Sequence, residues 1–212
     1  MSYRSLCIVT VFLALAASGV SAQSNLKIIP QPREVVATGA DFVLDSSATF
    51  ALGKPDDEQD KFAIETLSED LRTLWGVKLP AKGKRLIVVG IPSRDASVRG
   101  ACERRGLKVT PELGDEGYVL DVNADGIVAA ANAPAGVFYA VQTLRQLVKR
   151  LSDGRAAIEG VRIRDWPGLR YRACQDDVSR GPVPTMEYFK KQIRTLAAFK
   201  INVFCLYTEH VF

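Results

Sequence analysis

A predicted strand hairpin is followed directly by an amphipathic helix, and this pairing restricts the fold more than any other feature of the sequence. Alternating apolar residues from Tyr118 predict one strand, residues 123–126 predict a turn, and residues 127–131 predict the returning strand. A helix is then expected from Pro134, because apolar residues recur at its 3.6-residue period. They are Val137, Ala140, Val141, Leu144, Leu147, Val148 and Leu151. Such a stripe has to pack on a sheet, which predicts an α/β domain.

The preceding residues supply further elements for this domain. Residues 28–32 form an extended, proline-broken start, and short strands are expected at residues 42–44 and 86–89. Between these strands, Asp56 and Asp57 offer an N-cap for a helix that Gly76 ends. The apolar residues of that helix are Ala63, Leu67, Leu71 and Leu74. Residues 90–116 are expected to be charged and irregular. The prediction is an α/β sandwich, a mixed sheet with helices packed on it, over residues 23–164.

The pattern changes at residues 165–167. A strand is expected at residues 171–178, and Thr185 can cap a helix from Met186 to about Lys200. Four residues of this helix are expected to face inward: Phe189, Ile193, Leu196 and Ala197. The apolar run at residues 201–207 is typical of a parallel strand covered on both faces. A complete (β/α)₈ TIM barrel takes about 250 residues. Residues 165–212 are therefore expected to hold only the first β-α-β unit of a truncated barrel.

The first residues have the features of an export signal. An apolar run at residues 6–17 precedes small residues ending at Ala22, which predicts a signal peptide over residues 1–22. The run is shorter than the roughly 20 residues that a membrane span needs. We therefore expect an exported protein, periplasmic or extracellular, without a membrane span.

Composition excludes several other classes of function. The formal charge of +4 comes from basic residues scattered among acidic ones, so no nucleic-acid partner is expected. With one histidine and no clustered cysteines, no metal and no cofactor are expected. Cys174 and Cys205 fall in apolar strand patterns and are expected to be buried thiols. The sequence gives no indication of the oligomeric state.

Four segments resemble glycoside hydrolase family 20, which contains the β-N-acetylhexosaminidases. Residues 28–32 and 135–144 resemble the opening and the last helix of the domain that precedes the family's barrel. Residues 171–180 resemble its first barrel strand, and residues 199–204 resemble the start of its second. The four matches occur in the family's order and span nearly all of the chain after residue 22.

The resemblance implies a retaining hydrolysis that removes terminal N-acetylhexosamine from an N-acetylglucosaminide or N-acetylgalactosaminide. The acetamido oxygen of the substrate attacks the anomeric carbon, so the enzyme supplies no covalent nucleophile. One carboxylate orients the acetamido group, and a neighbouring acid protonates the leaving oxygen. The family's adjacent Asp-Glu pair lies further along the barrel, so no catalytic residue is assigned within residues 1–212. The chain as given is expected to be inactive.

Three residues are candidates for substrate binding. Arg172 matches a family arginine that donates hydrogen bonds to sugar hydroxyls, which suits the planar donors of a guanidinium. Its alternative role is a residue at the start of the strand, paired with an acid. Glu209 and His210 lie at the end of the second strand, where barrel active sites form. At this position the family shows aromatic and histidine residues followed by two aspartates, so Glu209 and His210 depart from the family's pattern. Their alternative role is that of loop residues without a function in binding.

Two alternatives stay open. One, which this departure keeps open, is a related glycosidase with a different sugar, for instance one similar to the α-glucuronidases. The other is a non-catalytic carbohydrate-binding or interaction module that truncation has left.

Overall fold

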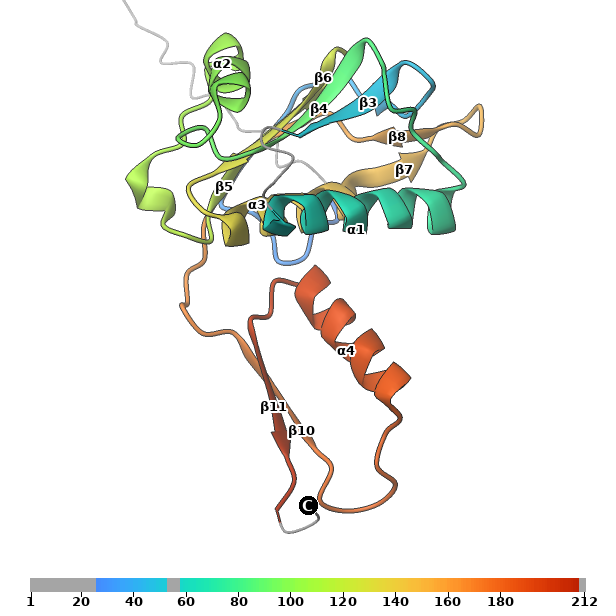
Figure 1. Cartoon of the computed structure of the whole chain (residues 1–212), viewed down its shortest axis with the longest axis vertical. Coiled ribbons are helices and arrows are strands. Elements are labelled where there is room, and N and C mark those ends of the chain that lie inside the picture. The colour runs from blue at the N-terminus through green and yellow to red at the C-terminus, as the bar shows by residue number, and fades with distance from the viewer. Residues whose placement is uncertain (1–25, 53–57, 210–212) are drawn as a thin grey trace, which may run out of the picture.

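The computed structural model describes residues 26–52 and 58–209 (Figure 1). The predicted signal peptide, the N-cap at Asp56 or Asp57, and His210 lie outside these residues. The helices and strands within residues 34–165 form what we call the front domain, and those within residues 173–207 form the C-terminal unit. In Figure 1 the C-terminal unit lies below the front domain.

A six-stranded mixed sheet is the centre of the front domain. Its order is β1-β9-β5-β6-β4-β3, in which β3, β4 and β6 run parallel and the other neighbours run antiparallel. The strands are β1 (Glu34–Ala37), β9 (Val161–Asp165), β5 (Tyr118–Asn123), β6 (Gly126–Ala131), β4 (Arg85–Gly90) and β3 (Ala48–Leu52). The predicted mixed sheet is therefore confirmed, although β1 and β3 were not predicted.

Helices cover both faces of this sheet. On one face lie α1 (Glu58–Trp75) and α3 (Pro134–Leu147), which pack against alternate residues of the strands, such as Leu120 and Ile127. On the other face, α2 (Ala96–Arg105) packs against the residues between them, such as Val119 and Val128. The hairpin of β5 and β6 is confirmed, but its strands are buried on both sides and not on one.

The helix α2 was missed by the sequence prediction of an irregular segment at residues 90–116. Asp95 caps it, because its carboxylate accepts hydrogen bonds from the backbone N–H groups of Ser97 (2.6 Å) and Val98 (3.0 Å). A short 3₁₀ helix, Pro111–Leu113, follows. The apolar residues of α2 are too few to stand out from its charged neighbours, so no stripe predicted it.

One predicted helix boundary needs correction. The helix α3 ends at Leu147, and Val148 begins β7 (Val148–Arg150), which pairs with β8 (Ala156–Ile158). These strands and β2 (Phe42–Val43) form a small antiparallel sheet, so strand pairing overrides the helical period there. In α1, which Gly76 ends as predicted with φ 69°, Leu74 of the predicted apolar pattern is 68% exposed.

The C-terminal unit is a parallel β-α-β arrangement, as predicted. β10 (Ala173–Asp177) pairs in parallel with β11 (Val203–Tyr207), and α4 (Met186–Ala198) connects them. Thr185 caps α4 by accepting a hydrogen bond from the N–H of Tyr188 (3.3 Å).

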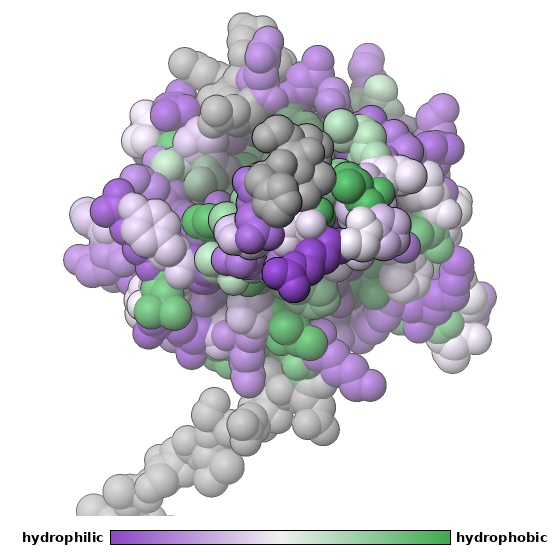
Figure 2. Space-filling model, turned by 90° about the horizontal axis from the view of Figure 1, so that it is seen from below, coloured by the Kyte–Doolittle hydropathy of each residue, from purple (hydrophilic) through white to green (hydrophobic). Residues whose placement is uncertain are grey.

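The inward-facing residues predicted for α4 are not buried. No residue of α4 is buried, and Ile193 is 51% exposed. The prediction of buried thiols was also wrong, since Cys174 is half-buried and Cys205 is exposed, while Cys102 of α2 is buried. Figure 2, which views the molecule from below, shows apolar patches at the surface around this end. Among its described residues, the C-terminal unit therefore buries only part of the apolar surface that a core of its own would need.

No helix in the part of the chain that the structure describes is long and apolar enough to cross a membrane.

Candidate functional site

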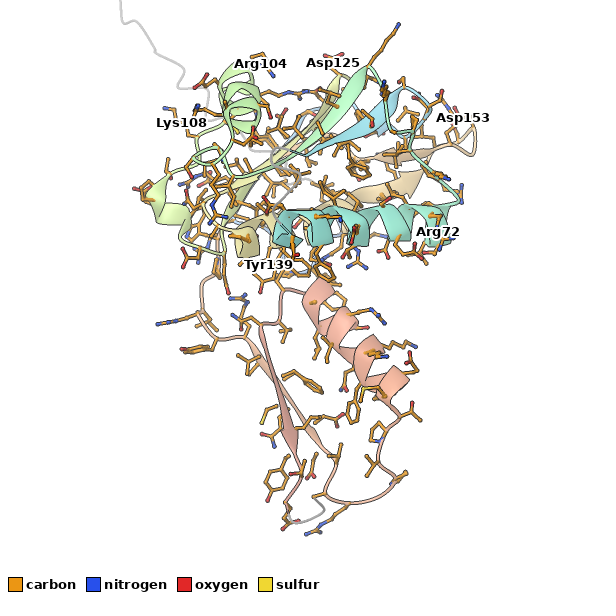
Figure 3. The ribbon with its side chains drawn as sticks, viewed as in Figure 1. Arg72, Arg104, Lys108, Asp125, Tyr139 and Asp153 are labelled. Carbon is orange, nitrogen blue, oxygen red and sulfur yellow. The ribbon has the colours of Figure 1, made fainter. Side chains whose placement is uncertain are left out.

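Arg172 lies where the front domain meets the C-terminal unit, and every nitrogen of its guanidinium group has a protein partner. Nε donates to the carbonyl of Lys200 (2.6 Å), and Nη1 donates to the carbonyl of Leu169 (2.8 Å). Nη1 is also 2.8 Å from Oε2 of Glu116, and Nη2 donates to the hydroxyl of Tyr139 (3.3 Å). Figure 3 shows Tyr139 on the side of the front domain that faces the unit. The guanidinium group therefore joins the two parts of the chain.

Arg172 and Glu209 are not brought together. Arg172 precedes β10, and its carbonyl accepts a hydrogen bond from the N–H of Asn202, just before β11. It therefore lies at the amino ends of the two parallel strands, whereas the exposed Glu209 follows the carboxyl end of β11. Five-residue strands separate the two ends by about 13 Å at ~3.3 Å per residue. One sugar ring cannot contact both positions in this arrangement. Sugar binding by either residue stays a prediction.

The carboxyl ends of the strands hold polar loops. Asp177 accepts hydrogen bonds from the N–H (2.9 Å) and the hydroxyl (2.6 Å) of Ser179. These hydrogen bonds, together with the charge of Arg180, lower the pKa of Asp177. Its neighbour Asp176 accepts a hydrogen bond from Gln192 of α4 (3.1 Å). The two adjacent carboxylates thus have different partners and do not form a proton-sharing pair.

A buried polar network that sequence reasoning missed lies beside Arg172. The Nζ of Lys200 is 2.9 Å from Oδ2 of Asp165 and 2.8 Å from the hydroxyl of Tyr118. That hydroxyl donates to Asp165 (3.1 Å) and lies 2.7 Å from the hydroxyl of Thr143. All four residues are buried, and Lys200 is only 6% exposed. In the sequence, the residues of this network appear only as polar residues within apolar patterns. Such a pattern does not show which residues are hydrogen-bond partners.

Burial controls the titration of this network. It lowers the pKa of Lys200, an effect that the nearby carboxylate of Asp165 opposes. Burial also raises the pKa of Tyr118 well above its usual value, and the charge of Asp165 raises it further. The phenol therefore stays protonated near neutral pH and donates to Asp165.

A cavity of about 330 Å³ adjoins the network and Arg172. Apolar groups supply much of its lining, including Pro30, Trp166 and Leu169. Four of its charged groups form ion pairs, Lys200 with Asp165 and Arg172 with Glu116. The fifth, Arg33, donates from Nε to the carbonyl of Trp166 (2.8 Å). Among the described residues, no group of three or more His, Cys, Asp and Glu could hold a metal ion. The arrangement suits a structural junction better than proton transfer.

The chain is similar to known proteins in sequence and in fold. The chain is 28% identical over 186 residues to a β-hexosaminidase of Porphyromonas gingivalis, an alignment that covers 85% of the chain and 22% of the relative. It is 29% identical over 190 residues to a β-N-acetylhexosaminidase of Cellulomonas fimi, covering 86% of the chain and 34% of the relative. The chain thus spans between a fifth and about a third of these relatives.

A solved structure agrees with these relatives. The exo β-N-acetylglucosaminidase of Vibrio harveyi, in complex with N-acetylglucosamine, matches with a TM-score of 0.64 and 25% identity. The match covers 84% of this chain and 25% of that one. The family description "Glycosyl hydrolase family 20, domain 2" fits residues 25–166. Because this match covers more than half of the chain, the protein belongs to glycoside hydrolase family 20.

Proposed function

We propose that the chain provides the front domain and the barrel start of a β-N-acetylhexosaminidase, which removes terminal N-acetylhexosamine from a carbohydrate. The observation that carries this proposal is the family match over residues 25–166. The names of the Porphyromonas and Cellulomonas relatives support the reaction, and the N-acetylglucosamine complex of the Vibrio enzyme supports the substrate class. In this proposal, residues 1–22 direct export, residues 23–164 form the front domain, and residues 165–212 begin the TIM barrel.

The chemistry of the proposal follows the substrate-assisted route. The acetamido oxygen of the substrate acts as the nucleophile, and an adjacent Asp-Glu pair orients that group and protonates the leaving oxygen. We expect this pair to come from outside residues 1–212. The paired state of the charged residues at the junction supports this view, because none of Lys200, Asp165 and Arg172 is placed to exchange a proton with a substrate.

The expected result is that residues 1–212 alone release no aryl group from an aryl N-acetyl-β-D-glucosaminide. The nucleotide sequence after the Phe212 codon is expected to continue through an Asp-Glu pair, and the longer product is expected to cleave the same substrate. Release of the chromophore is measured for both proteins at equal concentration. Turnover by the 212-residue chain, or an inactive product of a frame that contains the pair, would contradict the proposal.

The role of Arg172 is tested in the same longer product. If its guanidinium binds sugar hydroxyls, Arg172→Ala raises KM by about 10-fold or more, since a lost hydrogen bond to a charged group costs about 1.5–3 kcal/mol. Arg170→Ala is the matched control, because Arg170 is exposed and lies two residues away. An unchanged KM and kcat in Arg172→Ala would show that the guanidinium serves the junction alone.

A further inference from the structure

Lys200 occupies the turn that connects α4 to β11, and its backbone is held there. Its φ is 60°, in the left-handed region, and its N–H donates to the carbonyl of Ala197 (2.9 Å). A lysine in this conformation carries a steric cost that glycine avoids. Its side chain leaves the C-terminal unit and enters the front domain, where it is buried.

Inside the front domain, the ammonium group contacts Asp165 and Tyr118, and the hydroxyl of Tyr118 in turn contacts Thr143. Asp165 ends β9, Tyr118 begins β5, and Thr143 belongs to α3. Their mutual hydrogen bonds, from 2.7 to 3.1 Å, fix where the ammonium can sit. A buried charge is costly unless it is paired. The ammonium group of Lys200 is therefore expected to stay beside Asp165, which restricts the orientation of its side chain.

The backbone of the same turn carries the second link across the junction. The carbonyl of Lys200 accepts the hydrogen bond from Nε of Arg172, whose Nη1 is paired with Glu116 of the front domain. Near the end of α4, the carbonyl of Ala198 accepts a hydrogen bond from Gln146 of α3 (3.0 Å). These polar links all gather at one end of the unit, and Figure 1 shows the rest of it extending away from the front domain. A change in these hydrogen bonds is therefore expected to alter the orientation of the whole C-terminal unit relative to the front domain.

We propose that Lys200 is a positioning residue, which sets the orientation of the C-terminal unit on the front domain through its ion pair with Asp165 and its hydrogen bond to Tyr118. The orientation determines where the carboxyl ends of β10 and β11 point. This inference concerns the geometry of the chain and does not depend on which sugar the protein binds.

The distribution of distances between two spin labels, one in each part of the chain, reports how narrowly this orientation is defined. One label is placed on Cys205, which is exposed on β11. The other is placed on Asp125→Cys at the exposed turn between β5 and β6, at the far side of the sheet (Figure 3). Cys7 and Cys174 are replaced by serine. Cys102 stays unlabelled, because burial raises its pKa to about 11 and keeps it a thiol.

The expected result is a single narrow distance distribution in the full chain, which becomes at least twofold wider in Lys200→Met. Lys191→Met is the matched control, because it removes the same charge from an exposed position on α4 and is expected to leave the width unchanged. Lys200→Arg is expected to restore the narrow distribution. Arginine keeps the positive charge, and a cavity of about 330 Å³ lined by both Lys200 and Asp165 adjoins this position.

A second variant keeps the test decisive if Lys200→Met does not fold, as judged by circular dichroism. Tyr118→Phe preserves the buried ring and removes only the hydroxyl that contacts Lys200, so it is expected to widen the distribution less than Lys200→Met. An unchanged width in a folded Lys200→Met variant would overturn the proposal. So would equal widening in Lys191→Met. If Lys200→Met is unfolded, an unchanged width in Tyr118→Phe would overturn it.

Discussion

Leu71→Ala is expected to lower the free energy of unfolding of the front domain by about 3 kcal/mol. Leu71 is 1% exposed on α1 and packs in the cluster between α1, α3 and the sheet. Its truncation loses apolar burial and leaves a cavity that close-packed neighbours fill only partly, which costs about 2–5 kcal/mol for such residues. Urea unfolding followed by circular dichroism measures the change.

Leu74→Ala is the matched control for this prediction. Leu74 lies one turn later on the same helix and fits the same sequence pattern, but it is 68% exposed. A substitution at such a surface position is expected to change stability by less than about 0.5 kcal/mol. Equal losses in the two variants would mean that α1 does not present Leu71 to the sheet as described.

Asp121→Ala is expected to destabilise the front domain by about 2–3 kcal/mol. The carboxylate of Asp121 is 1% exposed on β5 and contacts Nη1 of Arg105 (2.6 Å) and Nε of Arg162 (2.8 Å). Its removal leaves two cations without their shared partner, and hydrogen bonds to charged groups contribute about 1.5–3 kcal/mol each. The loss stays below the sum of two such bonds, because the side chain of Arg162 is half exposed and can turn to water.

Asp153→Ala provides the comparison for Asp121. Asp153 also pairs with an arginine, Arg155, at 2.6 Å, but both side chains are exposed in a turn. Solvent screens such pairs, so no measurable change in the urea midpoint is expected. The idea that burial gives the Asp121 cluster its strength would fail if both variants lost the same stability.

The parts of the fold that were predicted from sequence depend on local patterns. The β5–β6 hairpin has its turn at residues 123–126, and the stripe of α3 from Val137 to Leu147 shows the helical period without interruption. Gly76 marks the end of α1 because its left-handed φ favours glycine. In each case neighbouring residues carry the signal, so no knowledge of distant contacts was needed.

The parts that were missed depend on distant contacts. Val148 continues the apolar period of α3, yet it pairs with Ile158 in β7 and β8. At the junction, Arg172 and Glu116 are 56 residues apart in sequence, and Lys200 and Tyr118 are 82 residues apart. A sequence shows that such residues are polar, but not which of them share a partner. The family resemblance suggested a sugar for Arg172, whereas the alternative of an acid partner describes the contact with Glu116.

The sheet order also has a consequence for folding during synthesis. Strand β9 lies between β1 and β5, so the earliest strand reaches the rest of the sheet only through the latest one. Residues emerge from the ribosome at about 5–20 per second. Until residues 161–165 have emerged, Val36 and its neighbours in β1 lack the strand with which they pair. The front domain therefore completes its sheet shortly before the C-terminal unit appears, and the acceptor for Lys200 is then already in place.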